Sequence, residues 1–267
     1  MRKRNPLTVK DVAAGATDAY IQLPTGLTYD VILVKLTNCT PAQFKNVRVQ
    51  AGTDHPQRFR DGADLTDINK HFGRRTNTAS GYLHFYFLRP EMKDYIERRM
   101  TCFGTSDINQ ARILFDIDAA AAGATVEAWA VRSPAQPSGL MTRITPFKET
   151  FAAAGDMSMK DIHKAVRGRV AAVHLKKSDI TAAKLELDTV PIWDLPRTEA
   201  VELSNTMDRD PQANWTVLDF IEEGDANSAA PLQGVQESDL TVTIGTSGVV
   251  EGYFETFAGL IRTQNAA

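Results

Sequence analysis

Apolar and polar residues alternate along several short segments in the first half of the chain. The apolar positions are Tyr29, Val31 and Leu33, then Val47 and Val49, then Leu83, Phe85 and Phe87. Further on, Ile113, Phe115 and Ile117 alternate with Asp116 and Asp118, and Val126, Ala128 and Ala130 lead to a stop at Ser133-Pro134. A period of two residues is typical of strands with one buried face. The first half is therefore predicted to be rich in β-strand.

A loop with an unusual composition follows these strands. Residues 133–139 read SPAQPSG, and prolines, serines and a glycine at this density disfavour regular structure. We place a domain boundary here, with one domain over residues 1–136 and a second over residues 137–267. Beyond it, Asp156 is a suitable N-cap, and Met159, Ile162 and Val166 are spaced i, i+3 and i+7, which predicts a helix.

The second half repeats the order of segments in the first. The paired strand segments are 31–36 with 170–175, 47–49 with 184–187, 83–87 with 215–220, 113–117 with 240–244, and 124–130 with 248–254. A short helix is predicted in each half, over 64–72 and 198–207. Their apolar stripes have the same spacing, Leu65, Ile68 and Phe72 in one and Ala200, Leu203 and Met207 in the other. A fixed order of matching segments indicates a duplicated domain.

Each repeat is about half of the 267 residues and consists of short strands, long turns and one or two surface helices. This size and pattern fit an eight-stranded jelly roll. An immunoglobulin-like sandwich is smaller, and neither half shows the strand–helix alternation of a parallel fold. The predicted fold is therefore all-β, with two tandem eight-stranded jelly-roll sandwiches and a few short surface helices.

Charge and cysteine content narrow the function classes. The net charge is −3 with Lys and Arg scattered along the chain, so no direct contact with nucleic acid is expected. Arg2, Lys3 and Arg4 are followed by Pro6 rather than by an apolar stretch, so we expect no secretion signal and no membrane span. The basic terminus either contacts anionic lipid or is simply solvated. Cys39 and Cys102 are predicted to be free, buried thiols rather than a disulfide.

Short catalytic motifs do not occur in the sequence. The five histidines form neither HxH nor HExxH, and there is no GxSxG nucleophile elbow and no GxGxxG or GxxxxGK phosphate loop. We therefore predict that the protein is not an enzyme.

Clustered carboxylates are the remaining candidates for chemistry. Asp116 and Asp118 stand at i, i+2, and Glu222, Glu223 and Asp225 surround Gly224. Calcium needs six to eight oxygen ligands, so Asp116, Asp118 and Asp225 are candidate ligands that would need further oxygens from another loop or subunit. The alternatives are solvated strand faces and turns, or a glycosidase acid pair.

Several uninterrupted blocks also resemble a known family. They are VAAG at Val12, LPTGLTYDVI at Leu23, TPAQFKNVRV at Thr40, HFYFLRPEMK at His84, FDIDAAAAG at Phe115, RVAAVHLK at Arg169 and EEGD at Glu222. Together they resemble the major capsid protein of corticoviruses, icosahedral marine phages whose shell encloses a lipid membrane.

The resemblance implies a major capsid protein with a double jelly roll, located in the virion shell and synthesised in the host bacterial cytoplasm. It implies homotrimeric, pseudo-hexagonal capsomers stabilised by calcium, with neighbouring capsomers and with vertex and membrane-associated virion proteins as partners. Duplication alone also predicts the tile, since three subunits place six similar sandwiches around an axis. The alternative function is a tandem jelly-roll glycan-binding protein or glycan-acting hydrolase.

Overall fold

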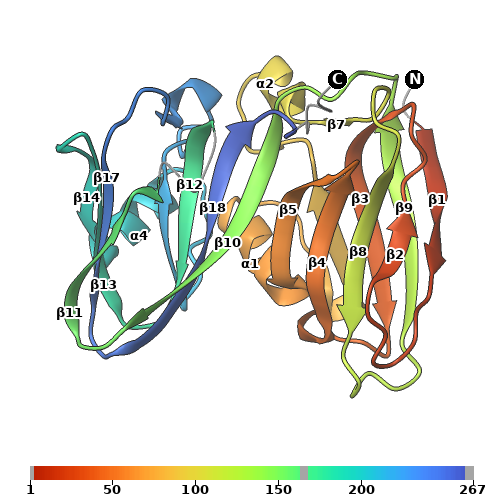
Figure 1. Ribbon diagram of the computed structural model, residues 1–267, viewed down its shortest axis with the longest axis horizontal. Helices are drawn as coiled ribbons and strands as arrows, with labels where there is room; N and C mark the ends of the chain where they lie inside the picture. The colour runs from red at the N-terminus through yellow and green to blue at the C-terminus, as the bar shows by residue number, and fades with distance from the viewer. Residues whose placement is uncertain (1–2, 163–167, 262–267) are drawn as a thin grey trace, which may run out of the picture. The chain divides into compact units, whose positions relative to one another are not determined.

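The computed structural model describes residues 3–162 and 168–261, which form two compact units (Figure 1). The first unit contains the described residues up to Thr142, except 70–73, together with those from Gly259 onward. The second contains residues 70–73 and 143–258. In the segment predicted as the connection, residues 133–139, Ser133 is the last residue of one strand, and residues 134–139 precede the strand that begins at Met141.

Antiparallel strands build the first unit. Its elements are β1 (Lys3–Lys10), β2 (Ala19–Gln22), β3 (Thr28–Thr37), β4 (Phe44–Ala51), β5 (Asp54–Asp61), α1 (Gly62–His71), β6 (Tyr82–Tyr86), α2 (Tyr95–Met100), β7 (Phe103–Gly104), β8 (Ala111–Ile117) and β9 (Thr125–Ser133). The strands follow the order β5-β4-β8-β2-β1-β9-β3-β6, and β7 pairs with β3. Because β1 pairs with β9 through its first residues and with β2 through its last, it passes from one sheet to the other.

The second unit has two separate sheets. Its elements are β10 (Met141–Phe151), β11 (Gly155–Lys160), β12 (Arg169–Lys176), β13 (Ile180–Leu187), β14 (Val190–Pro196), α4 (Arg197–Thr206), β15 (Trp215–Asp219), β16 (Ala230–Pro231), β17 (Ser238–Ile244) and β18 (Gly248–Ala258). One sheet has the order β15-β12-β18-β10 with β16 on β12, and the other the order β11-β17-β13-β14.

Strand pairing repeats from one unit to the next. The pairs β3·β9, β3·β6, β3·β7, β4·β5, β4·β8 and β2·β8 correspond to β12·β18, β12·β15, β12·β16, β13·β14, β13·β17 and β11·β17. Helix α1 lies between β5 and β6, as α4 does between β14 and β15. The segments paired in the sequence therefore occupy equivalent places in the two units, including the two predicted helices.

The alternating residues form the cores of the two units. In the first, Ile113 and Phe115 of β8 are fully buried, and the Phe115 ring stacks on Phe44 at 4.3 Å between centroids. In the second, Leu185, Val242 and Phe254 belong to one cluster of buried apolar side chains. Burial of one face of each strand is the main driving force that an alternating pattern supplies.

The helix predicted from Asp156 is wrong over residues 155–160, although Ile162 is helical. Residues Gly155–Lys160 form β11, which pairs with β17 along its whole length. Met157 and Met159 point inward at a period of two, and the Asp156 carboxylate accepts a hydrogen bond from Thr243 Oγ1 at 2.6 Å instead of capping a helix. Val166, also assigned to this helix, lies outside the described residues.

The structure also bears on the predictions about the two cysteines and about membrane-spanning segments. Cys39 and Cys102 are buried thiols that form no disulfide, as predicted. Within residues 3–162 and 168–261, no helix is long and apolar enough to cross a bilayer.

Candidate functional site

The structure places Asp116 on β8 and Asp118 just after it, and it gives both carboxylates partners within the first unit. Asp116 accepts hydrogen bonds from the Asp18 backbone N–H at 2.9 Å and from Asn46 Nδ2 at 2.5 Å. Asp118 forms an ion pair with Lys45 and accepts from the Ala120 N–H at 2.8 Å. A hydrogen bond from Lys45 holds the pKa of Asp118 below its usual value. Through Asn46 and Lys45, these two carboxylates link the end of β8 to the neighbouring strand β4.

Asp225 belongs to the second unit, where it caps the short 3₁₀ helix at Ala226–Ser228 by accepting from the Asn227 N–H at 2.7 Å. Across the part of the chain that is described, no three His, Cys, Asp or Glu residues gather in a group that could hold a metal ion. None of Asp116, Asp118 and Asp225 belongs to such a group among the described residues. Calcium binding stays a prediction that requires further oxygen ligands from another loop or subunit.

The turn predicted around Gly224 contains an unusual carboxylate. Burial raises the pKa of Glu222 to about 7, and the nearby charge of Asp219 raises it further than Arg209 lowers it. Its Oε2 atom is buried without a hydrogen-bond partner. An acid that must ionise in this environment destabilises the folded state above neutral pH.

We expect Glu222→Gln to stabilise the protein at pH 8 and to change little at pH 4. The folded-state pKa lies above the unfolded value, so the stability linked to Glu222 is present at low pH and is lost as pH rises through about 7. The gain at pH 8 is about 1 kcal/mol, because Glu222 is partly exposed and solvent screens its charge. Urea unfolding at both pH values measures it. The exposed neighbour Glu223 supplies the control Glu223→Gln, and an equal gain from both variants would contradict the assignment.

A largely buried ion pair of the first unit joins residues that no sequence motif connects. Asp30, fully buried on β3, accepts from Arg99 Nη1 and Nη2 at 3.3 and 3.2 Å and from Ser133 Oγ at 3.0 Å. Arg99 and Asp30 are separated by 69 positions in the sequence. The segment 94–99 reads DYIERR, in which Asp94 is a suitable N-cap and two apolar residues stand beside charged ones. This pattern indicates a short helix that carries Arg99, and it says nothing of the pairing with Asp30.

The second unit contains two similar polar centres. Asp219 accepts from Arg209 Nε at 2.8 Å and from the Ile221 N–H at 3.0 Å. The His174 and Glu255 side chains lie 3.1 Å apart and are almost completely buried. Burial lowers the pKa of His174 against the opposing effect of Glu255, which favours the neutral ring.

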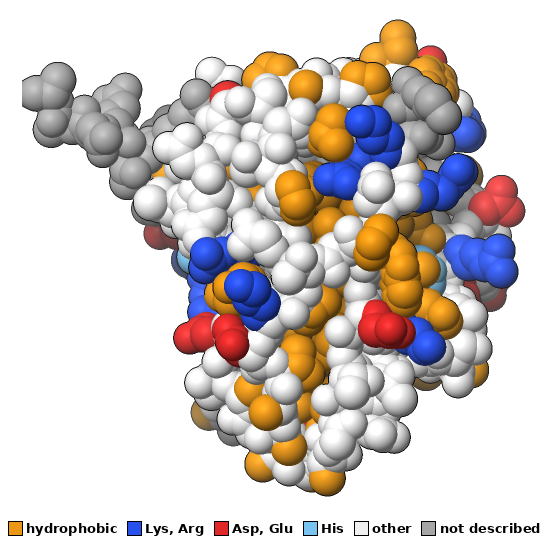
Figure 2. All heavy atoms as spheres, turned by 90° about the vertical axis from the view of Figure 1, so that its right-hand side faces the viewer, with side chains coloured by type: hydrophobic (Ala, Val, Ile, Leu, Met, Phe, Trp, Pro, Cys, Tyr) orange, Lys and Arg blue, Asp and Glu red, His pale blue; other side chains and the backbone are white. Residues whose placement is uncertain are grey.

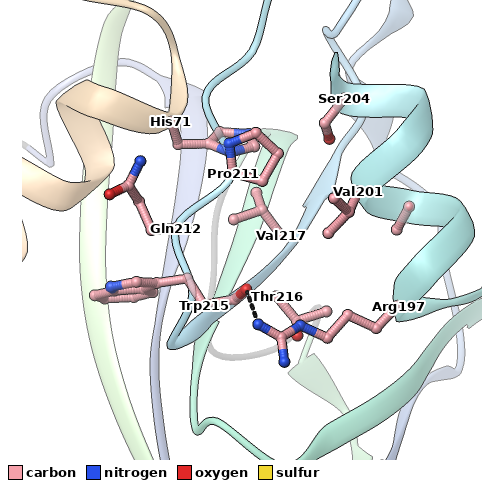
Figure 3. A pocket seen from close by; sticks show the side chains of 10 residues that line it. His71, Arg197, Val201, Ser204, Pro211, Gln212, Trp215, Thr216 and Val217 are labelled. Carbon is pink, nitrogen blue, oxygen red and sulfur yellow. Dashed lines mark hydrogen bonds between the residues drawn. The ribbon is translucent and has the colours of Figure 1, made fainter. Parts of the chain in front are cut away.

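Figure 3 shows a pocket beside α4, lined by His71, Trp215 and helix residues that include Arg197, whose guanidinium donates to the Trp215 carbonyl oxygen at 3.5 Å. The space that it offers is about 10 Å³, enough for one water molecule at most. An adjoining open groove of about 390 Å³ is lined by Arg197, Thr198, Val201, Glu202, Pro211, Gln212 and Ala213. It has one carboxylate, whereas glycoside hydrolysis needs two.

The tryptophans also argue against sugar binding. Trp193 and Trp215 are buried, at 9% and 4% exposure, and Trp129 is half-buried on β9. A sugar-binding cleft presents aromatic faces to solvent. The glycan alternative therefore finds no support in these residues.

Comparison with known proteins gives the family. The model of the viral coat protein P2 N-terminal domain matches residues 4–133, and that of the viral coat protein P2 C-terminal domain matches residues 141–260. The major capsid protein P2 of Pseudoalteromonas phage PM2 is 32% identical over 243 residues, which cover 88% of each chain. This chain belongs to the viral coat protein P2 family. The recognition made from the sequence blocks is thus confirmed.

Solved structures agree with membership of the P2 family. The crystal structure of the major capsid protein P2 from bacteriophage PM2 matches with a TM-score of 0.91 and 29% identity, over 98% of this chain and 99% of that one. The STIV major capsid protein matches with a TM-score of 0.68 at 11% identity, over 100% and 99% of the two chains. The PBCV-1 capsid model matches with a TM-score of 0.64 at 8% identity, over 96% and 93%.

The matches to the STIV and PBCV-1 capsid proteins concern the fold alone, and they confirm the double jelly roll. The P2 relative is a structural capsid protein of a phage. The predictions of a capsid protein, a place in the virion shell and a non-enzymatic role are therefore confirmed.

Proposed function

We propose that this P2-family protein is the major capsid protein of its virus and assembles as homotrimers that tile an icosahedral shell around an internal lipid membrane. The duplication carries the proposal. Since each subunit contains two units with the same strand pairing, a threefold assembly presents six similar sandwiches and has nearly hexagonal symmetry. Hexagonal tiles can cover a large shell with few kinds of contact. Neighbouring capsomers and vertex and membrane-associated virion proteins would be its partners.

Native mass spectrometry of the purified protein at low micromolar concentration tests the stoichiometry. We expect a species of three times the chain mass of 29.4 kDa. A permanent shell also requires subunit interfaces well above about 1,200 Å² in total, so the trimer should persist on dilution. A stable monomer or dimer under every salt and divalent-cation condition would contradict the proposal.

Calcium is proposed as a stabiliser of the assembled form, through Asp116, Asp118 or Asp225 together with oxygens from a neighbouring subunit. Chelation is expected to lower the melting temperature of the assembly by several degrees, because a ligand that binds only the native form stabilises it. Asp225→Asn should reduce this response while preserving the helix cap, since Asn also caps well. Asp179→Asn, which affects an ion pair with Lys177, is the control. An unchanged melting temperature with chelator and no cation density in an experimental map would remove calcium from the account.

A further inference from the structure

Two exposed large hydrophobic side chains of the first unit, Tyr95 and Ile96, are neighbours at one end of its sandwich. Within the described residues of this unit the exposed large hydrophobic side chains are Tyr95, Ile96, Leu140 and Ile261, with exposures of 67%, 75%, 40% and 37%. Tyr95 and Ile96 open helix α2, and Figure 1 shows α2, β7 and the start of β1 at the same end of this unit. Scattered exposed apolar residues need no explanation, but a group of them at one place marks an interaction surface.

Strand register places basic side chains at this end too. Arg99 of α2 binds Asp30 at the start of β3. The adjacent Tyr29 pairs with Arg132 of β9, and Arg132 pairs with Lys3 of β1. Exposed Lys3 and Arg4 therefore lie at the α2 end. Lys93 and Arg98, also exposed, flank the apolar pair along the chain. The face in Figure 2 likewise has hydrophobic side chains along its upper rim and Lys and Arg side chains beneath them.

The apolar pair is held in position by buried contacts. The Asp94 carboxylate caps α2 by accepting from the Ile96 N–H at 2.7 Å and the Glu97 N–H at 3.2 Å. At the other end of α2, Arg99 binds Asp30, and the buried Thr101 hydroxyl donates to the Phe87 carbonyl oxygen at 2.6 Å. Because these contacts fix the helix on β3, Tyr95 and Ile96 remain exposed instead of folding back onto the core.

We infer that the α2 end of the first unit is a lipid-contact surface, on which Tyr95 and Ile96 enter the headgroup region of an anionic membrane while Lys93, Arg98, Lys3 and Arg4 contact lipid phosphates. The inference deepens the proposed function, since it assigns the surface that faces the internal membrane. An aromatic and an aliphatic side chain at the tip of a short helix, with cations around them, suit a soft charged surface. A protein partner would instead favour a larger apolar centre with fitted pockets.

Contact of this kind is weak for one subunit and strong for many. Each copy contributes two apolar side chains and a few cations, which supports only reversible binding. A trimer, and still more a shell, presents the surface many times, and multivalent attachment raises the overall affinity without new contacts. Salt should weaken the binding because it screens the contribution of the cations.

Co-sedimentation with lipid vesicles tests the inference. The probes are vesicles of phosphatidylcholine with about one third phosphatidylglycerol, and vesicles of phosphatidylcholine alone. We expect the purified protein to bind the anionic vesicles more tightly, and the double variant Tyr95→Ser with Ile96→Ser to bind them at least about tenfold more weakly. Lys93→Glu with Arg98→Glu should lose the preference for anionic lipid.

The matched control removes two exposed apolar side chains of the second unit, Val190 and Ile192 on β14 at 59% and 36% exposure. Val190→Ser with Ile192→Ser should bind vesicles as the unchanged protein does. Native mass spectrometry first confirms that all variants keep the same stoichiometry, so that a failed vesicle result leaves the trimer proposal standing. Absence of vesicle binding by the unchanged protein, or equal losses in both double-serine variants, would overturn the inference. Retained vesicle binding by the Tyr95 and Ile96 variant would assign the patch to a protein partner and overturn it too.

Discussion

Glu91→Gln is expected to lower the free energy of unfolding by about 3–5 kcal/mol at pH 7. The Glu91 carboxylate, 2% exposed, lies between two buried guanidinium groups, 2.5 Å from Arg74 Nη2 and 2.8 Å from Arg89 Nε. Replacing the carboxylate with a neutral amide removes the negative charge that both guanidinium groups contact. Urea unfolding measures the loss.

The pH dependence of the same ion pairs has a definite sign. Burial alone would raise the pKa of Glu91, but Arg74 and Arg89 hold it below its ordinary value. A depressed pKa contributes stability that is present above the unfolded value and is lost as pH falls, so Glu91→Gln should cost least in acid. The control is Glu127→Gln, which breaks an exposed pair with Lys35 at 3.6 Å and should cost at most about 1 kcal/mol. Equal losses from the two variants would show that the buried carboxylate has no special role.

Asp219→Asn should destabilise the second unit by a similar amount, about 3–5 kcal/mol. The carboxylate is fully buried and binds Arg209 Nε at 2.8 Å, with His71 Nε2 3.5 Å away. Burial would raise the pKa of Asp219, but His71 and Arg209 hold it low. The amide retains an acceptor for the Ile221 N–H, so the loss reports the unpaired Arg209 charge.

Thermal and urea unfolding of Asp219→Asn are best compared with those of Glu251→Gln. The latter removes a charge from a largely exposed pair, with Lys148 Nζ 3.7 Å from the Glu251 carboxylate. Exposed pairs contribute up to about 1 kcal/mol. A loss below 1 kcal/mol for Asp219→Asn would mean that the site relaxes or admits water after the substitution.

Local patterns carried most of the information about the fold. An alternating pattern reports which face of a strand is buried, and the order of such segments revealed the duplication, which the pairing of β3 with β9 and of β12 with β18 reproduces. A helix was predicted at Asp156 because Met159 and Ile162 are three residues apart, as on one face of a helix. Met157 and Met159 are two residues apart, as on one face of a strand, and pairing with β17 stabilises the strand. A short apolar segment is compatible with both periods, and its tertiary partner decides.

The candidate sites were harder to predict, because the partners of a charged side chain are often distant from it in the sequence. Asp30 pairs with Arg99, yet nothing in the sequence around either residue indicates this ion pair. Asp116 and Asp118 were grouped because they are close in sequence, yet each has its own partner, Asn46 for one and Lys45 for the other. Charge pairing across a sandwich depends on the fold, so proximity in sequence is a weak guide to cation ligands.

Electron cryo-microscopy of the purified oligomer tests the central claim most directly. Averaged views along the symmetry axis should show a threefold particle with six similar lobes, two from each subunit, since each chain contains two units with the same strand pairing. A monomeric particle, a twofold dimer, or a threefold particle without this near-sixfold repetition would contradict the account of the chain as the tile of a viral shell.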